Sequence, residues 1–106
     1  FFVFALTTFT LCKKNPQEAL RTYEKILMEK PNLIKALVGR AKALDHMAEK
    51  QKSNAYLKQG IVAYKNVLLN HGSKLDDDTY KELAEVCIAR MRFGGEDLLV
   101  FLLLLL

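Results

Sequence analysis

The sequence has few of the residues that hold small proteins together without a large apolar core. Its 106 residues include two cysteines, Cys12 and Cys87, two prolines and no tryptophan. Two cysteines cannot build a disulfide-rich scaffold, so that class of protein is excluded. Disorder is excluded for the interior of the chain, because Leu, Ile, Val and Tyr recur throughout it. These residues are numerous enough for a modest core.

The sequence also lacks a cluster of charge of one sign. Sixteen basic residues alternate with twelve acidic ones, which gives a net charge of +4, and Lys13-Lys14 is the basic doublet. A nucleic-acid surface gathers Lys and Arg on one face, with aromatic residues between them. This pattern is missing, so we expect no nucleic-acid partner and interpret the mixed charge as a solvated helical surface.

Both ends of the chain are apolar but short. Residues 1–12 are uncharged and precede Lys13-Lys14, whereas a membrane-spanning helix needs about 20 apolar residues. The segment 1–14 is therefore interpreted either as the remnant of a membrane anchor or signal segment, or as part of a buried helix. Residues 96–106 form an apolar C-terminal tail that ends in five leucines. We do not expect this tail to form a folded surface element.

The interior predicts four helices. The first is expected to begin with Asn15 as a cap before Pro16 and to end before Pro31. Asn32 is the expected cap of the second helix, and the third should end near Gly72. The fourth should begin in the segment 76–79, with Thr79 as its cap, and should end at residues 94–95. No glycine or proline marks the boundary between the second and third helices, so its position is left open.

Each predicted helix carries an apolar stripe at spacings of three and four residues, and no segment alternates as an exposed strand does. We therefore predict an all-α fold. The stripes consist of Ala19, Leu20, Tyr23, Ile26 and Leu27; Ile34, Leu37, Val38, Ala41, Leu44 and Ala48; Leu57, Ile61, Tyr64, Val67 and Leu68; and Tyr80, Leu83, Ala84, Cys87, Ile88 and Met91.

The stripes fit the 34-residue period of tetratricopeptide repeats, in which small residues lie where two helices cross. The first predicted helix has the pattern of the second helix of a pair, and the next repeat then begins at Ile34. The third helix fits two registers, one through Ser53 and Leu57 to Gly60 and one through Gly60 to Tyr64 and Val67. We therefore expect antiparallel helix pairs over residues 15–95, stacked as a short tetratricopeptide-like solenoid fragment. A generic helical bundle is the alternative.

Residues that could carry catalysis or bind a metal are scattered. His46 and His71 lie far apart, without a ligand pattern around them. The run of acidic residues at positions 76–78 lacks the alternating oxygen ligands of an EF-hand loop. We therefore predict that the chain alone is not an enzyme and that it holds no cofactor or metal.

Several segments look specific: residues 15–24 and 35–44, the Glu49-Lys50 and Ser53-Asn54 pairs, residues 60–64 and residues 90–93. Together they resemble the lumenal tetratricopeptide region of the aspartyl/asparaginyl β-hydroxylase family. The resemblance implies a type II membrane protein on the lumenal side of the endoplasmic reticulum. It also implies a parent that hydroxylates Asp or Asn in epidermal-growth-factor-like domains with iron(II) and 2-oxoglutarate. No part of this chain matches the catalytic jelly roll of that family, so no catalytic residue is carried over.

In stacked repeats the first helix of each pair lines a concave groove. The groove should bind a protein or peptide, either the catalytic or substrate domain of a β-hydroxylase-like parent or the ligand of a free-standing tetratricopeptide adaptor. An ordinary solvated surface remains an alternative for these residues. The positions expected to face a ligand are Lys35, Val38, Lys42, Asp45, His46, Lys81 and Glu85.

Overall fold

The computed structural model describes residues 15–94 and 98–105, and every regular element in this part of the chain is helical. The all-α prediction is confirmed. The elements are α2 (Pro16–Glu29), α3 (Ile34–Gln51), α4 (Asn54–His71), the short 3-10 helix η1 (Gly72–Lys74), α5 (Asp77–Gly94) and α6 (Leu98–Leu105). Residues 1–14, including the expected anchor remnant, lie outside the described residues. Among the described helices, none is both long enough and apolar enough to cross a membrane.

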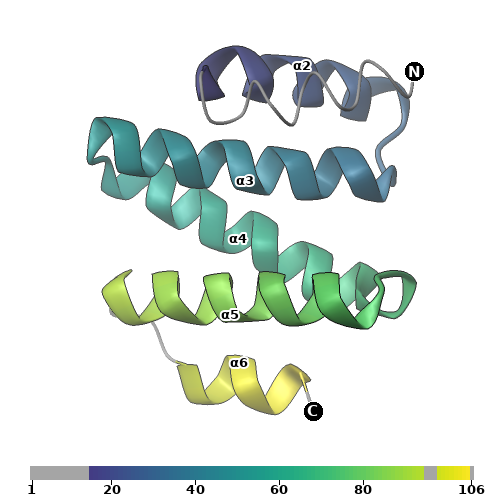
Figure 1. The fold of residues 1–106 in the computed structure, drawn as a ribbon, viewed down its shortest axis with the longest axis vertical. Helices are drawn as coiled ribbons and strands as arrows, with labels where there is room; N and C mark the ends of the chain where they lie inside the picture. The colour runs from purple at the N-terminus through teal and green to yellow at the C-terminus, as the bar shows by residue number, and fades with distance from the viewer. Residues whose placement is uncertain (1–14, 95–97, 106) are drawn as a thin grey trace.

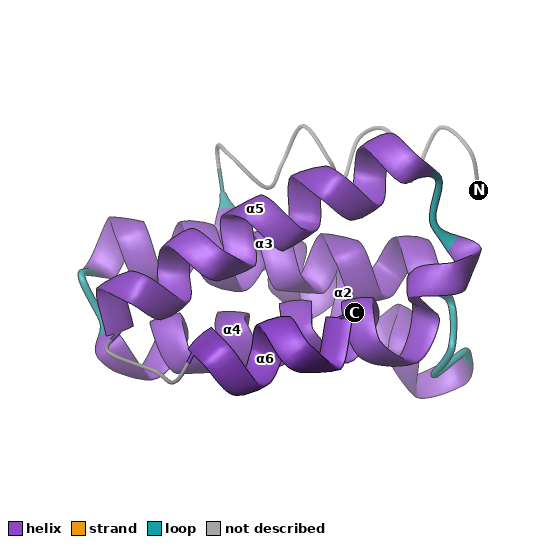
Figure 2. Cartoon of the chain, turned by 90° about the horizontal axis from the view of Figure 1, so that it is seen from below, coloured by secondary structure: helices purple, strands orange, loops and turns teal. Residues whose placement is uncertain are grey.

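The helices form an antiparallel stack, in which α2 packs on α3, α3 on α4, and α4 on α5 (Figure 1). Seen along the stack, α3 and α5 lie in one layer, whereas α2, α4 and α6 lie in the other (Figure 2). This alternation is the arrangement expected of a short helical-repeat fragment. Helices α3 and α4 occupy the positions predicted for one helix pair, and α2 occupies the position predicted for the second helix of the preceding pair.

The start of α2 follows the predicted capping chemistry, but two other predicted caps are wrong. Asn15 Oδ1 accepts a hydrogen bond from the backbone N–H of Glu18, as an N-cap side chain should. Helix α3, in contrast, is preceded by Leu33, which makes no side-chain capping bond, so Asn32 is not the cap. Helix α5 begins at Asp77, which places Thr79 inside its first turn.

The break between α3 and α4 is made by Lys52. This residue adopts the left-handed conformation, with φ 49° and ψ 45°, and its N–H donates to the carbonyl of Ala48. Glycine or asparagine usually occupies such a position, and because a lysine stands here the break could not be recognised from residue type. Ser53 follows as the cap of α4, and its Oγ accepts a hydrogen bond from the N–H of Tyr56.

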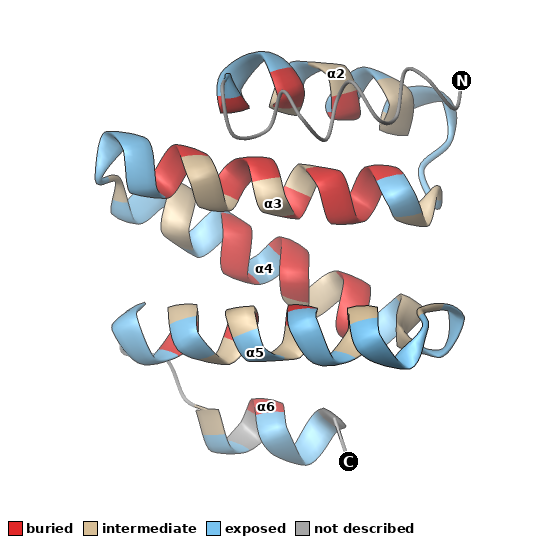
Figure 3. Ribbon diagram, in the orientation of Figure 1, coloured by how far each residue is buried: buried red, intermediate tan, exposed pale blue. Residues whose placement is uncertain are grey.

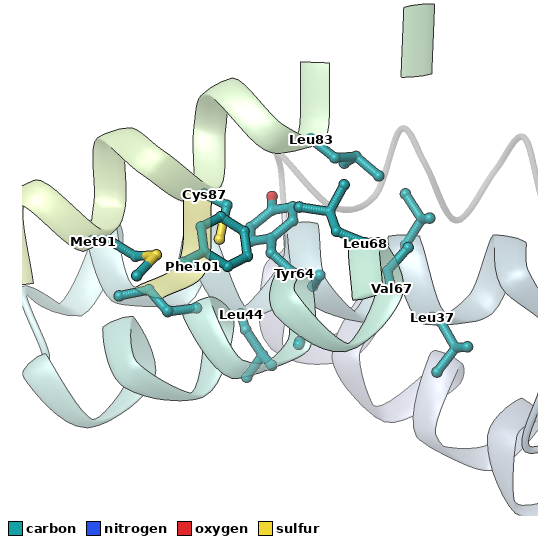
Figure 4. Close-up of a cluster of buried hydrophobic side chains, with 13 residues drawn as sticks. Leu37, Leu44, Tyr64, Val67, Leu68, Leu83, Cys87, Met91 and Phe101 are labelled. Carbon is teal, nitrogen blue, oxygen red and sulfur yellow. The ribbon is translucent and has the colours of Figure 1, made fainter. Parts of the chain in front are cut away.

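The main core lies where α3, α4 and α5 meet, and the buried residues are concentrated in α3 and α4 (Figure 3). Tyr64 of α4 lies at its centre, among side chains from α5 and α6 (Figure 4). A second cluster joins α2 to α3 through Ala19, Tyr23, Ala36 and Ala43.

Of the two registers that fitted the third helix, the structure favours the one through Gly60, Tyr64 and Val67, all of which are buried. A Cβ at Gly60 would lie 3.6 Å from the Cβ of Leu44, so this glycine lies at the close approach of α4 to α3. Ser53, the corresponding small residue of the other register, lies outside the helix as its cap.

The leucine-rich C-terminal run differs from expectation, because residues 98–105 form helix α6 and pack on both α4 and α5. Among the α6 residues whose burial is described, Phe101 is buried, and it belongs to the main core. Lys65 of α4 places its Nζ 6.0 Å from the centroid of the Phe101 ring. Helix α6 therefore occupies the place of the second helix of the repeat that α5 begins.

Candidate protein-interaction site

The candidate site is the surface of the layer formed by α3 and α5, here called the α3–α5 face. The structure places six of the seven predicted groove residues at positions open to solvent. Lys35, Lys81 and Glu85 are exposed, whereas Lys42, Asp45 and His46 are half-buried. Val38 differs, since it is only 7% exposed and belongs to the main core. Its side chain is therefore unavailable to a ligand, and the expectation that it faces one is wrong.

Two ion pairs join α3 to α5 across this face. Arg90 Nε donates to Asp45 Oδ1 at 2.6 Å, and Arg90 Nη2 donates to Asp45 Oδ2 at 3.1 Å. This two-point contact holds the planar guanidinium in one orientation. Lys42 Nζ lies 3.6 Å from Glu82 Oε1 in a more exposed pair. Two of the five charged residues that the sequence assigns to the groove, Lys42 and Asp45, are therefore already balanced by side chains of α5.

The charges of Asp45 and Arg90 influence the pKa of Tyr64 in the core. The hydrogen bonds that Arg90 donates to Asp45 raise the pKa of the Arg90 guanidinium above its ordinary value. Burial raises the pKa of the Tyr64 phenol well above its ordinary value of about 10, and the negative charge of Asp45 raises it further. The Tyr64 phenol is therefore neutral at physiological pH. The opposite charges of Asp45 and Arg90 balance each other.

A pocket of about 400 Å³ opens at one end of the α3–α5 face, where α3 ends, α4 begins and α5 ends. We call it the Phe93 pocket. It combines the Asp45–Arg90 pair with apolar side chains from all three helices and with polar residues of the α3–α4 turn. Its lining consists of Asp45, Ala48, Glu49, Lys52, Ser53, Asn54, Leu57, Arg90 and Phe93.

Sequence reasoning placed Asp45 at the site but missed Arg90 and Phe93. A weak signal for Phe93 was present, because it falls two residues after Met91 and therefore leaves the apolar stripe of the fourth helix. Arg90 gave no comparable signal, since it meets Asp45 from 45 residues away along the chain. The positions of Lys52 and Ser53 depend on the α3–α4 turn, whose position the sequence left open.

The described residues of this face form no catalytic arrangement. Across residues 15–94 and 98–105, no group of three or more His, Cys, Asp or Glu side chains is placed to hold a metal ion. His46 lies on α3, whereas His71 ends α4. What the face presents is two ion pairs, exposed lysines and an apolar pocket.

Comparisons of the chain with protein-family models, with curated proteins and with solved structures found no match.

Proposed function

We propose that this chain is a non-catalytic helical-repeat scaffold that binds a protein segment along the α3–α5 face. The observation that supports the proposal is the Phe93 pocket of about 400 Å³ at one end of this face. The Asp45–Arg90 pair, which joins α3 to α5, is part of its lining. Helical-repeat proteins use one layer of their stacked helices as an extended binding surface. A face with fixed side chains needs little ordering when a partner binds, which favours affinity.

The chemistry of the partner is proposed from the charge on this face. Lys35, Lys81 and Glu85 are exposed, and no ion-pair partner is found for any of them within the described residues, so their charges sum to +1. Exposed charges of this kind mainly steer encounter and select partners. They favour a protein segment that carries Asp or Glu.

The resemblance of residues 15–94 to the β-hydroxylase family leads to a more specific proposal. The chain would be the scaffold of a β-hydroxylase-like protein of the endoplasmic reticulum membrane, on the lumenal side. It would support a separate catalytic domain, or present an epidermal-growth-factor-like substrate to it. The iron and 2-oxoglutarate chemistry would belong to that other domain, and this chain would need no cofactor of its own.

The binding proposal is tested by charge reversal on the face. We expect an acidic epidermal-growth-factor-like domain to bind the wild-type chain. Lys35→Glu/Lys42→Glu should weaken this binding by about fivefold at low salt, which corresponds to about 1 kcal/mol. It should also reduce the salt dependence of Kd. Isothermal titration calorimetry at two salt concentrations measures both quantities.

The matched control is Lys58→Glu/Lys74→Glu, which makes the same change in net charge on α4 and η1, where both lysines are exposed. It should leave Kd close to the wild-type value. Equal Kd values for the two double variants would contradict the assignment of binding to the α3–α5 face. Absence of binding by the wild type would contradict the choice of partner. Sequencing the flanking gene separates the hydroxylase scaffold from a free-standing adaptor, because a scaffold requires a jelly-roll region with iron-ligating histidines.

A further inference from the structure

Phe93 is the most exposed aromatic side chain at the candidate site. It is 85% exposed near the end of α5 and lies on the pocket, beside Leu57 of α4 and Ala48 of α3. A single exposed apolar residue needs no explanation. An aromatic ring that lines a concave, mainly apolar pocket is different, because such positions are where binding energy concentrates.

Some residues that line the Phe93 pocket are packed against, or paired with, other residues of the fold. Leu57 is backed by the end of α5, since a Cβ at Gly94 would lie 3.8 Å from Leu57 Cδ2 and 3.7 Å from Ile61 Cδ1. The lining also contains the Asp45–Arg90 pair, with its bond of 2.6 Å. Leu57 and the Asp45–Arg90 pair are therefore held in place before a side chain binds, which lowers the entropic cost of binding at this part of the lining.

The charges that line the Phe93 pocket cancel. Asp45 is paired with Arg90, and the two remaining charged residues, Glu49 and Lys52, have opposite signs. A segment with a strong charge of either sign would gain no net attraction here and would lose its hydration. An uncharged segment with a large apolar side chain loses little and buries the faces of Phe93 and Leu57.

We propose that the Phe93 pocket binds one bulky apolar side chain, preferably aromatic, from an uncharged stretch of a partner polypeptide. The inference rests on the proposed scaffold function and adds an anchor to it. The partner's ring packs against Phe93 in an offset or edge-to-face arrangement. Asn54 and Ser53, at the start of α4, lie at the pocket to hydrogen-bond the partner's peptide groups. The acidic part of the same partner then lies along Lys35 and Lys42, toward the other end of α3.

The test uses small probes that carry one side chain and two peptide groups. N-acetylphenylalanine amide, with about 15 non-hydrogen atoms, should bind with a Kd on the order of 1 mM. In NMR titrations, the backbone amide signals of Ala48, Leu57 and Phe93 should shift together. N-acetylalanine amide should produce no saturable shift. Phe93→Ala should weaken the binding of the phenylalanine probe by at least about fivefold.

Met28→Ala is the matched control, because Met28 is 84% exposed on α2 and takes no part in the pocket. Both variants should unfold at the wild-type denaturant midpoint. The inference is overturned if the phenylalanine and alanine probes behave alike, or if Phe93→Ala binds as tightly as Met28→Ala does. Such a failure leaves the scaffold proposal standing, since that proposal is tested separately through Lys35, Lys42 and an acidic protein domain.

Discussion

Gly39 and Gly60 both lie within helices, but their surroundings differ. A Cβ at position 39 would overlap the Cζ and Cε1 atoms of Tyr23, whereas one at position 60 would find its nearest neighbours at 3.6 Å. Gly39→Ala should therefore lower the free energy of unfolding by about 1–3 kcal/mol through overpacking. Gly60→Ala should leave it unchanged or raise it by up to about 1 kcal/mol, because alanine favours a helix. Urea denaturation compares the two, and equal effects would contradict the close approach of Tyr23 to Gly39.

Burial of the Tyr64 phenol should make the stability of the fold depend on pH. The pKa of this phenol is raised in the folded protein by burial, so above pH 10 the unfolded chain loses the phenolic proton first. The contribution of Tyr64 to the free energy of unfolding is fully present below pH 10. Above pH 10 this contribution should fall by up to about 1.4 kcal/mol per pH unit. Tyr64→Phe should remove this component of the decline. Identical slopes for wild type and variant, in denaturation series between pH 9 and about 11, would show that Tyr64 ionises freely in the fold.

Helices α3 and α5 are connected by two ion pairs of different geometry. The Asp45–Arg90 pair has two short bonds, with Asp45 13% exposed, whereas Lys42–Glu82 is a single contact at 3.6 Å to a side chain that is 60% exposed. A double-mutant cycle of Asp45→Ala and Arg90→Ala should give a coupling energy of about 1 kcal/mol. The cycle for Lys42→Ala and Glu82→Ala should give a value near zero. A reversed order would contradict the fixed geometry of the first pair.

Helix α6 should stabilise the fold through the aromatic side chain of Phe101. Phe101 is buried in the main core and connects α6 to α4 and α5. Phe101→Ala should lower the free energy of unfolding by about 3–5 kcal/mol, as for other buried aromatic residues. Leu103→Ala is the control in the same helix, because Leu103 is exposed. A loss below about half a kcal/mol for Phe101→Ala, measured by denaturant titration, would show that α6 does not contribute to the core.

The helices were largely predictable from the sequence because their apolar stripes and strong end signals agree. Asn15-Pro16 and Pro31 bound α2 as expected, and Gly72 and Gly94 lie at the predicted ends of α4 and α5. The failures have local causes. Lys52 adopts a conformation that its residue type does not indicate. Helix α6 was missed because a run of leucines has no periodicity, and contacts with α4 and α5 give it a buried side.

The candidate site was less predictable than the helices. Position within a repeat indicated Lys35, Lys42 and Asp45, but it could not show that Lys42 and Asp45 are paired with α5. It also placed Val38 on the binding face, whereas the packing of α3 turns this side chain into the core. Pairing across a long sequence separation depends on how the helices cross, and one helical stripe does not contain that information.

At the scale of the whole molecule, the two ends of the stack differ. The outer surface of α2 is polar, with Glu18, Arg21 and Lys25 around it. The outer surface of α6, in contrast, presents Leu99, Leu102 and Leu103 to solvent. A polar outer surface is typical of a capping helix in a repeat protein, whereas an apolar one is not. Between these ends lies the α3–α5 face, for which we propose selective binding.

We expect the chain as a whole to lack 2-oxoglutarate oxygenase activity. Iron-dependent oxygenases of the 2-oxoglutarate class hold the metal with two histidines and a carboxylate on one site. The two histidines of this sequence are His46, on α3, and His71, at the end of α4. We expect the purified chain to release no CO2 from labelled 2-oxoglutarate, with or without added iron(II), and to bind the acidic partner domain equally well in both conditions. Iron-dependent release that persists in a His46→Ala/His71→Ala variant would indicate a contaminant. Release that is lost in this variant would overturn the scaffold proposal and make the chain an enzyme.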